Sequence, residues 1–193
     1  MSTHVMMEGS VIVSGANNWM MLYNGTSDAP VGHVSLWRVD LSEHGPGRAL
    51  FWRTSLTGGV PEVFADNAPM AAWLAGEVLA ADSPYRDGCI AVHSAQFATA
   101  NRLPHGYTET IETAAGRITL AWEELGTPVY GYATPGPDDV SSHSACYVPA
   151  NRVTVALGDV QAAGSAMPED WFGTPASSCF LALSETWITQ RRS

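Results

Sequence analysis

The feature of this sequence that most limits its fold is a succession of short, strand-sized segments separated by residues that favour turns. Gly32–Leu41 is followed by the turn-forming string EHGPG, and Ala49–Leu56 is followed by Gly58-Gly59. Segments of the same kind continue as far as Cys179–Ile188. Short segments at such spacing, broken by Gly, Pro and Asn, are typical of β-sandwiches and β-barrels. We therefore expect an all-β, mainly antiparallel fold with about ten strands.

One segment departs from this pattern. Asp66–Ala80 has a candidate N-cap at Asp66 and a proline, Pro69, in what would be the first helical turn. Its larger apolar residues recur at three- and four-residue spacing, which predicts one amphipathic helix. Such a helix would pack on the sheet or cap the end of a barrel. A closed or nearly closed barrel is the first expectation, because closure removes exposed strand edges, and a two-sheet sandwich is the alternative.

The length of 193 residues suits a single domain that spans residues 1–193. In strand number and in its expected internal cavity, this barrel resembles the calycin-type barrels, the lipocalin-like proteins and their enzyme relatives. The resemblance lies in the architecture and not in matched motifs. It implies a cavity that holds a small, largely apolar molecule.

Charged residues are scarce and mostly acidic. They form 15% of the chain, against about 25% in a typical soluble domain. Two explanations remain open: part of the surface is covered in a homo-oligomer such as a homodimer, or the domain is built around an apolar cavity. The net charge of −10 argues against binding to nucleic acid or to anionic membranes. The chain has no lysine, which excludes Schiff-base chemistry on a lysine.

The remaining motif searches point to a protein without a cofactor. No GxGxxG string, phosphate-binding loop or GxSxG string occurs, and the three cysteines form no CxxC pair. The spacing of His143 and Cys146 is too weak a pattern to predict a metal site. The first residues lack the basic and apolar regions of a secretory signal, and no run approaches the ~18 apolar residues of a membrane span. We expect a cytoplasmic protein without cofactor or metal.

Strand alternation assigns side chains to faces and yields the candidate site. Because Arg38 and Asp40 favour water, His33 and Trp37 are assigned to the inner face of their strand, and Trp52 to that of the next. In Arg117–Leu125 the inner set is Ile118, Leu120, Trp122 and Glu124. In the last strand it is Cys179, Leu181, Leu183, Glu185 and Trp187. Two carboxylates thus lie on otherwise apolar faces, a conflict that can mark function.

The predicted site is an apolar pocket lined by Trp37, Trp52, Trp122 and Trp187. His33, Glu124 and Glu185 are its candidate catalytic groups, since burial beside tryptophan raises the pKa of a carboxyl group toward values useful for proton transfer. This pattern favours a cofactor-independent isomerase, cyclase or dehydratase that acts on a small apolar molecule. The alternatives are a non-catalytic carrier with the same pocket, or an interaction module whose tryptophans are all core. The two glutamates could also be solvated groups at a barrel rim.

Overall fold

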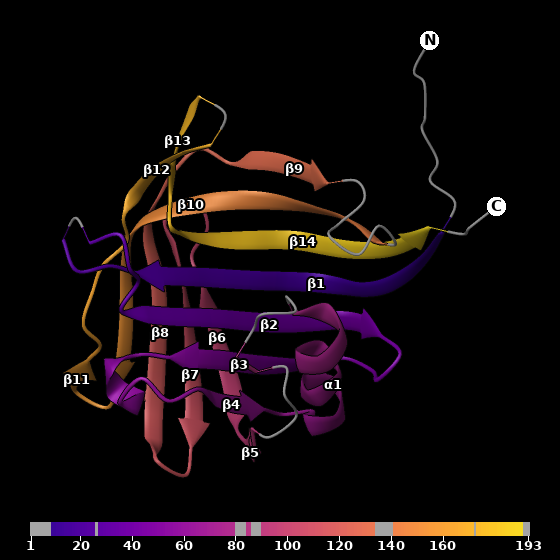
Figure 1. Ribbon diagram of the computed structural model, residues 1–193, viewed down its shortest axis with the longest axis horizontal. Coiled ribbons are helices and arrows are strands. Elements are labelled where there is room, and N and C mark those ends of the chain that lie inside the picture. Colours follow the sequence, from indigo (N-terminus) through magenta and orange to yellow (C-terminus); the bar gives the residue numbers. More distant parts are fainter. Residues whose placement is uncertain are drawn as a thin grey trace.

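The computed structural model is a mostly β protein whose main sheet curls into a nearly closed, mainly antiparallel ten-stranded barrel (Figure 1). It describes residues 9–25, 27–79, 84–85, 90–133, 141–171 and 173–190. The barrel follows the strand order β5-β4-β3-β2-β1-β14-β10-β8-β7-β6. The expected all-β barrel with one helix is therefore confirmed. No helix within the described ranges has the length and apolar character needed to cross a membrane.

The strands, in chain order, are β1 (Gly9–Leu22), β2 (Gly32–Ser42), β3 (Gly47–Arg53), β4 (Glu62–Ala65), β5 (Val92–Ser94), β6 (Gln96–Asn101), β7 (Gly106–Thr113), β8 (Gly116–Leu125), β9 (Val129–Ala133), β10 (Ser141–Leu157), β11 (Val160–Gln161), β12 (Pro168–Trp171), β13 (Thr174–Ser177) and β14 (Cys179–Gln190). Of these, β9 and β11 pair with β10 beside the main path, and β12 pairs only with β13. β4 and β5 run parallel, and every other pairing is antiparallel.

The single predicted helix is present, although it differs in detail. α1 (Ala68–Trp73) is capped by Asn67, whose side chain accepts a hydrogen bond from the Met70 N–H, and not by the predicted Asp66. A π-helical turn, Leu74–Val78, continues it. Asp66 instead accepts a hydrogen bond from the Arg48 N–H at 2.6 Å, which joins the start of the helix to β3.

Turn-favouring residues do not interrupt β1. The string Gly15-Ala16-Asn17-Asn18 is of the kind that favours turns, yet β1 runs through it, because all four residues pair with β2. A Cβ at Gly15 would lie 1.9 Å from the Arg38 carbonyl oxygen, so only glycine permits this approach. Pro168–Trp171 forms the short strand β12, and residue 172 lies outside the described ranges.

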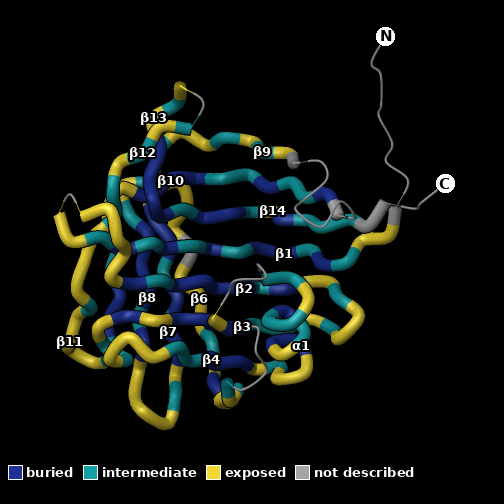
Figure 2. The backbone as a smooth tube through the Cα atoms, viewed as in Figure 1, coloured by how far each residue is buried: buried dark blue, intermediate teal, exposed yellow. Residues whose placement is uncertain are grey.

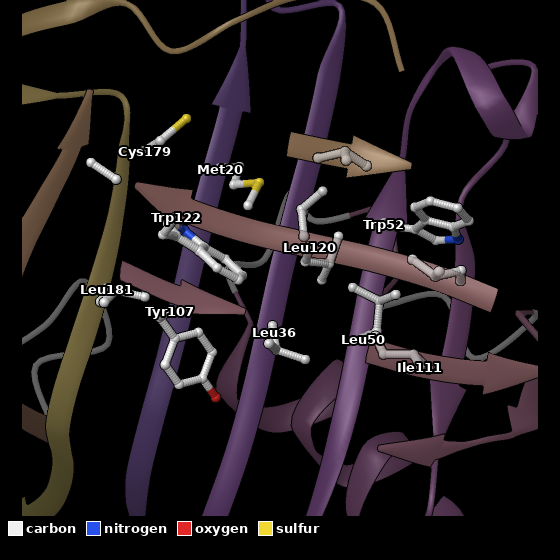
Figure 3. Close-up of a cluster of buried hydrophobic side chains, with 14 of the residues drawn as sticks. Met20, Leu36, Leu50, Trp52, Tyr107, Ile111, Leu120, Trp122, Cys179 and Leu181 are labelled. Atoms are coloured by element: carbon white, nitrogen blue, oxygen red, sulfur yellow. The ribbon is translucent and has the colours of Figure 1, made fainter. Parts of the chain in front are cut away.

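Two apolar cores lie on opposite faces of β1–β4. The barrel core lies in the interior and includes Leu36, Trp52 and Trp122 (Figure 3). The helix-side core lies between the outer face of the same strands and α1, and includes Trp37 and Met70. Figure 1 shows α1 in front of β2 and β3, with β6–β8 behind, and Figure 2 shows that most of β2 and β3 is buried. β2 is therefore covered on both faces, like a central strand in a layered protein.

Candidate functional site

The residues predicted to form one pocket fall in three separate places. Trp52 and Trp122 lie in the barrel core, as expected. Trp37 and Trp187 belong to the helix-side core or pack against it, so the prediction that they face the same interior is wrong. His33 shares the face of Trp37 because the two are separated by four residues on one strand. Glu124 lies on the surface.

The inward orientation predicted for Glu124 is wrong for a local reason. Its backbone φ is +51°, which interrupts the alternation that placed Ile118, Leu120 and Trp122 in the barrel core. The side chain is 60% exposed, and its Oε1 lies 3.2 Å from the Arg152 Nε. Glu124 thus forms a surface ion pair, an interaction that contributes little to stability.

Glu185 is buried, but on the outer face of the barrel. Ser184 has a φ of +54°, and this irregularity moves Glu185 and Trp187 off the face that carries Leu181. Only 5% of Glu185 is exposed, and the Trp187 Nε1–H donates a 2.7 Å hydrogen bond to its Oε1. Burial raises the pKa of Glu185 to about 7, although the Trp187 hydrogen bond opposes this shift.

Small and aromatic side chains surround Glu185. Its partner across the ladder is Gly15 on β1, which has no side chain to pack beside the carboxyl. His143 stacks on Trp187 with ring centroids 4.7 Å apart, and burial lowers the pKa of this histidine. Burial, followed by the nearby charge of Glu185, raises the pKa of Tyr147 to about 12. Glu185 therefore lies in an aromatic environment that disfavours its charged form.

His33 lies too far from Glu185 to act with it. Val39 of β2 and Glu185 of β14 both pair with Gly15, and His33 lies six residues before Val39. At strand spacing this corresponds to about 20 Å. Burial, and then the charge of Arg53, lowers the pKa of His33 to about 4, so it is neutral at physiological pH. The three predicted acid–base residues do not converge.

The barrel interior contains a buried polar cluster that the sequence did not predict. Glu109, only 1% exposed, accepts hydrogen bonds from Arg48 at 2.6 Å, from Thr99 at 2.7 Å and from the Tyr107 hydroxyl at 2.9 Å. The three donors come from β3, β6 and β7, so the cluster joins the two ends of the strand path. Thr99 is exposed and the Arg48 side chain is 27% exposed, so solvent reaches the cluster from one side.

Two further polar groups of the interior lack hydrogen-bond partners. Arg38 is opposite Arg48 in the ladder, and Asn18 is diagonal to Arg38 across the β1–β2 pair. Within the described part of the chain, the buried Arg38 Nε and the Asn18 Oδ1 have no hydrogen-bond partner. Burial, and then Glu109, raises the pKa of Tyr107 to about 12, and the charge of Arg38 opposes this, as expected for neighbouring groups. Asn18 is 98% buried, so an unsatisfied oxygen there is costly.

Arg38 was expected on the outer, solvated face of β2, and that expectation is wrong. Both faces of β2 are covered, and Arg38 follows Val34 and Leu36 on the barrel side while its end reaches the rim. Glu109 is a carboxylate on an otherwise apolar strand face, the pattern that marked Glu124 as a candidate, because it lies between Tyr107 and Ile111 on β7. Searching every strand for that pattern would have found it.

No metal centre and no related protein helps to identify the site. Among the described residues, no group of three or more His, Cys, Asp or Glu side chains could hold a metal ion. Comparison of the chain with profiles of protein families, with curated proteins and with solved structures finds no match.

Proposed function

We propose that the protein is a non-catalytic carrier or binding protein that holds a small, largely apolar organic molecule in the barrel. One observation carries this proposal: the Asn18 Oδ1 and the Arg38 Nε are buried without hydrogen-bond partners in the described chain. Binding sites for small organic molecules are mainly apolar and contain a few polar groups that orient the ligand. The barrel core supplies the apolar part of the site. Trp122 pairs with Tyr107 across the β7–β8 ladder, and Leu36 pairs with Asn18 across the β1–β2 ladder, so both lie close to the polar groups.

The position of the polar groups is suited to binding from solvent. The Arg38 side chain is 43% exposed although its Nε is buried, so this arginine reaches from the rim into the barrel. A ligand entering here would meet Arg38 and Asn18 first and place its apolar part against the barrel core. An N–H or O–H group on the ligand would satisfy the Asn18 oxygen.

The first test uses phenylnaphthylamine, a neutral fluorescent probe with an apolar body and one N–H group. We expect saturable binding at one site per chain, with a blue-shifted emission. Leu36→Trp should weaken this binding at least about tenfold by filling space beside Asn18, while Leu41→Trp is the matched control. Leu41 is on the same strand but is 54% exposed.

Absence of saturable binding to the wild-type protein would contradict the proposal, and so would equal affinity in the two tryptophan variants. Circular dichroism establishes whether Leu36→Trp folds. If it does not, fluorescence energy transfer from the tryptophans to the bound probe tests whether the probe lies in the barrel. Trp122→Phe should reduce this transfer, whereas Trp171→Phe, which changes a residue outside the barrel core, should reduce it less.

Acid–base catalysis remains a second candidate function, supported by the pKa of Glu185 near 7. A carboxyl group that is half protonated at neutral pH is suited to proton transfer. The site would involve Glu185, Trp187 and His143 on the outer face of the barrel. NMR titration of the Glu185 carboxyl measures that pKa, and a value typical of exposed glutamates would remove the support.

A further inference from the structure

The two arginines of the barrel interior, Arg48 and Arg38, are not equally well paired with acidic side chains. Arg48 is matched by Glu109, with a nitrogen–oxygen distance of 2.6 Å. Among the described residues, the one acidic group within ion-pair range of Arg38, which lies opposite Arg48, is Asp40, at 3.7 Å. That separation is too long for a hydrogen bond, and the Asp40 side chain is 65% exposed, so water screens its charge. The barrel end thus contains one arginine whose charge is only weakly balanced.

An arginine in this state favours an anion. The guanidinium group cannot lose its proton, so its charge persists at the barrel rim and its buried Nε–H still requires an acceptor. A carboxylate or sulfonate that accepts a hydrogen bond from it forms one of the stronger polar contacts found in proteins. The neighbouring Asn18 oxygen requires a donor, which an anion alone does not supply.

We infer that the ligand is an organic anion: an apolar body with a carboxylate or similar group that contacts Arg38, and an N–H or O–H group that reaches Asn18. This inference rests on the proposed function and specifies its ligand class. The overall charge of −10 makes a general attraction of anions to this protein unfavourable. Selectivity for anions would therefore have to arise locally, at Arg38.

Two probes that differ in one group test the inference. Anilinonaphthalene sulfonate and phenylnaphthylamine share the same aromatic rings and N–H group, and only the former carries a sulfonate. We expect the wild-type protein to bind the sulfonate more tightly. Arg38→Met, which keeps the apolar stem but removes the charge, should weaken sulfonate binding about tenfold or more and weaken binding of the neutral probe far less.

Arg152→Met is the matched control, because it changes the net charge equally but at a surface position where the arginine side chain is 59% exposed. It should alter neither affinity. If Arg38→Met does not fold, displacement of the neutral probe from the wild-type protein replaces it, and octanoate should displace the probe at lower concentration than octanol.

The possible failures are distinct. If neither probe binds the wild-type protein, the proposed function itself is overturned, and internal water must satisfy Asn18 and Arg38. If the neutral probe binds but the sulfonate has no advantage, or Arg38→Met weakens both probes equally, the carrier function stands and the anionic ligand class is overturned. Displacement by octanol at the lower concentration would overturn it as well.

Discussion

At the scale of single residues, two backbone angles decide where the candidate carboxyl groups lie. Glu124 and Ser184 are the non-glycine residues with positive φ in the described ranges, at +51° and +54°. Left-handed backbone is uncommon for such residues, and here each one ends a regular alternation of faces. The first places Glu124 in solvent, and the second places Glu185 under the aromatic side chains of the outer face.

The raised pKa of Glu185 makes stability depend on pH. Its folded pKa is about 7 against an ordinary value of 4.5, so the folded state holds the proton more tightly than the unfolded state. The resulting stabilisation is complete below the unfolded pKa, falls as the pH rises through this window, and is absent above it. Glu185→Gln stays neutral, so it should exceed the wild type by up to about 3 kcal/mol at pH ~8 and match it near pH ~4.

Urea unfolding across this pH range measures the difference between the two proteins. Glu124→Gln is the control, since the same change at an exposed carboxylate should shift stability by less than about 0.5 kcal/mol at every pH. Stability curves of wild type and Glu185→Gln that remain parallel from low to high pH would show that Glu185 titrates normally.

At the scale of elements, the close approach of β1 to β2 depends on one glycine. The register between these strands shifts between Ser14 and Gly15, and Gly15 lies against the Arg38 backbone. This contact allows β1 to continue beside β2. It also helps to determine which face of β2 carries Arg38, and so that its side chain points into the barrel. Bulges of this kind commonly reorient side chains beside binding sites.

Gly15→Ala should therefore be strongly destabilising, by about 3 kcal/mol or more, because the new Cβ would overlap the Arg38 carbonyl oxygen and force the strands apart. Gly76→Ala provides the contrast. Its Cβ would meet nothing within 4 Å, and alanine favours helical backbone, so stabilisation by up to ~1 kcal/mol is expected. Urea midpoints measure both changes, and a Gly15→Ala protein as stable as the wild type would contradict the role given to this contact.

At the scale of the whole molecule, the Arg48–Glu109 pair links distant parts of the strand path. Arg48 is in β3, near one end of that path, while Glu109 and Thr99 are in β7 and β6 at the other end. No ladder pairing between β5 and β6 is found in the described chain; the backbone joins them at Ala95, and the Arg48–Glu109 pair adds a side-chain link between the two ends of the path. A buried ion pair favours one such arrangement, because each charge is costly without its partner.

Glu109→Met should cost about 3 kcal/mol or more, since it leaves Arg48, Thr99 and Tyr107 without the carboxylate that accepts a hydrogen bond from each of them. The double variant Arg48→Met/Glu109→Met should be more stable than Glu109→Met alone, because no charge is then left unpaired. A double-mutant cycle by urea unfolding measures the coupling, and strictly additive effects would show that the pair does not hold the barrel closed.

The sequence alone determined the all-β class, the single helix, most strand positions and the apolar faces of regular segments such as Ile118–Trp122. These properties follow from local backbone preference and period-two alternation, which neighbouring residues specify. Only the tertiary structure decided which covered face of β2 is the barrel interior, and hence that Arg38 points inward. It also decided the phase of alternation at Glu124 and Glu185, because bulges and positive φ angles depend on pairing with strands distant in the sequence.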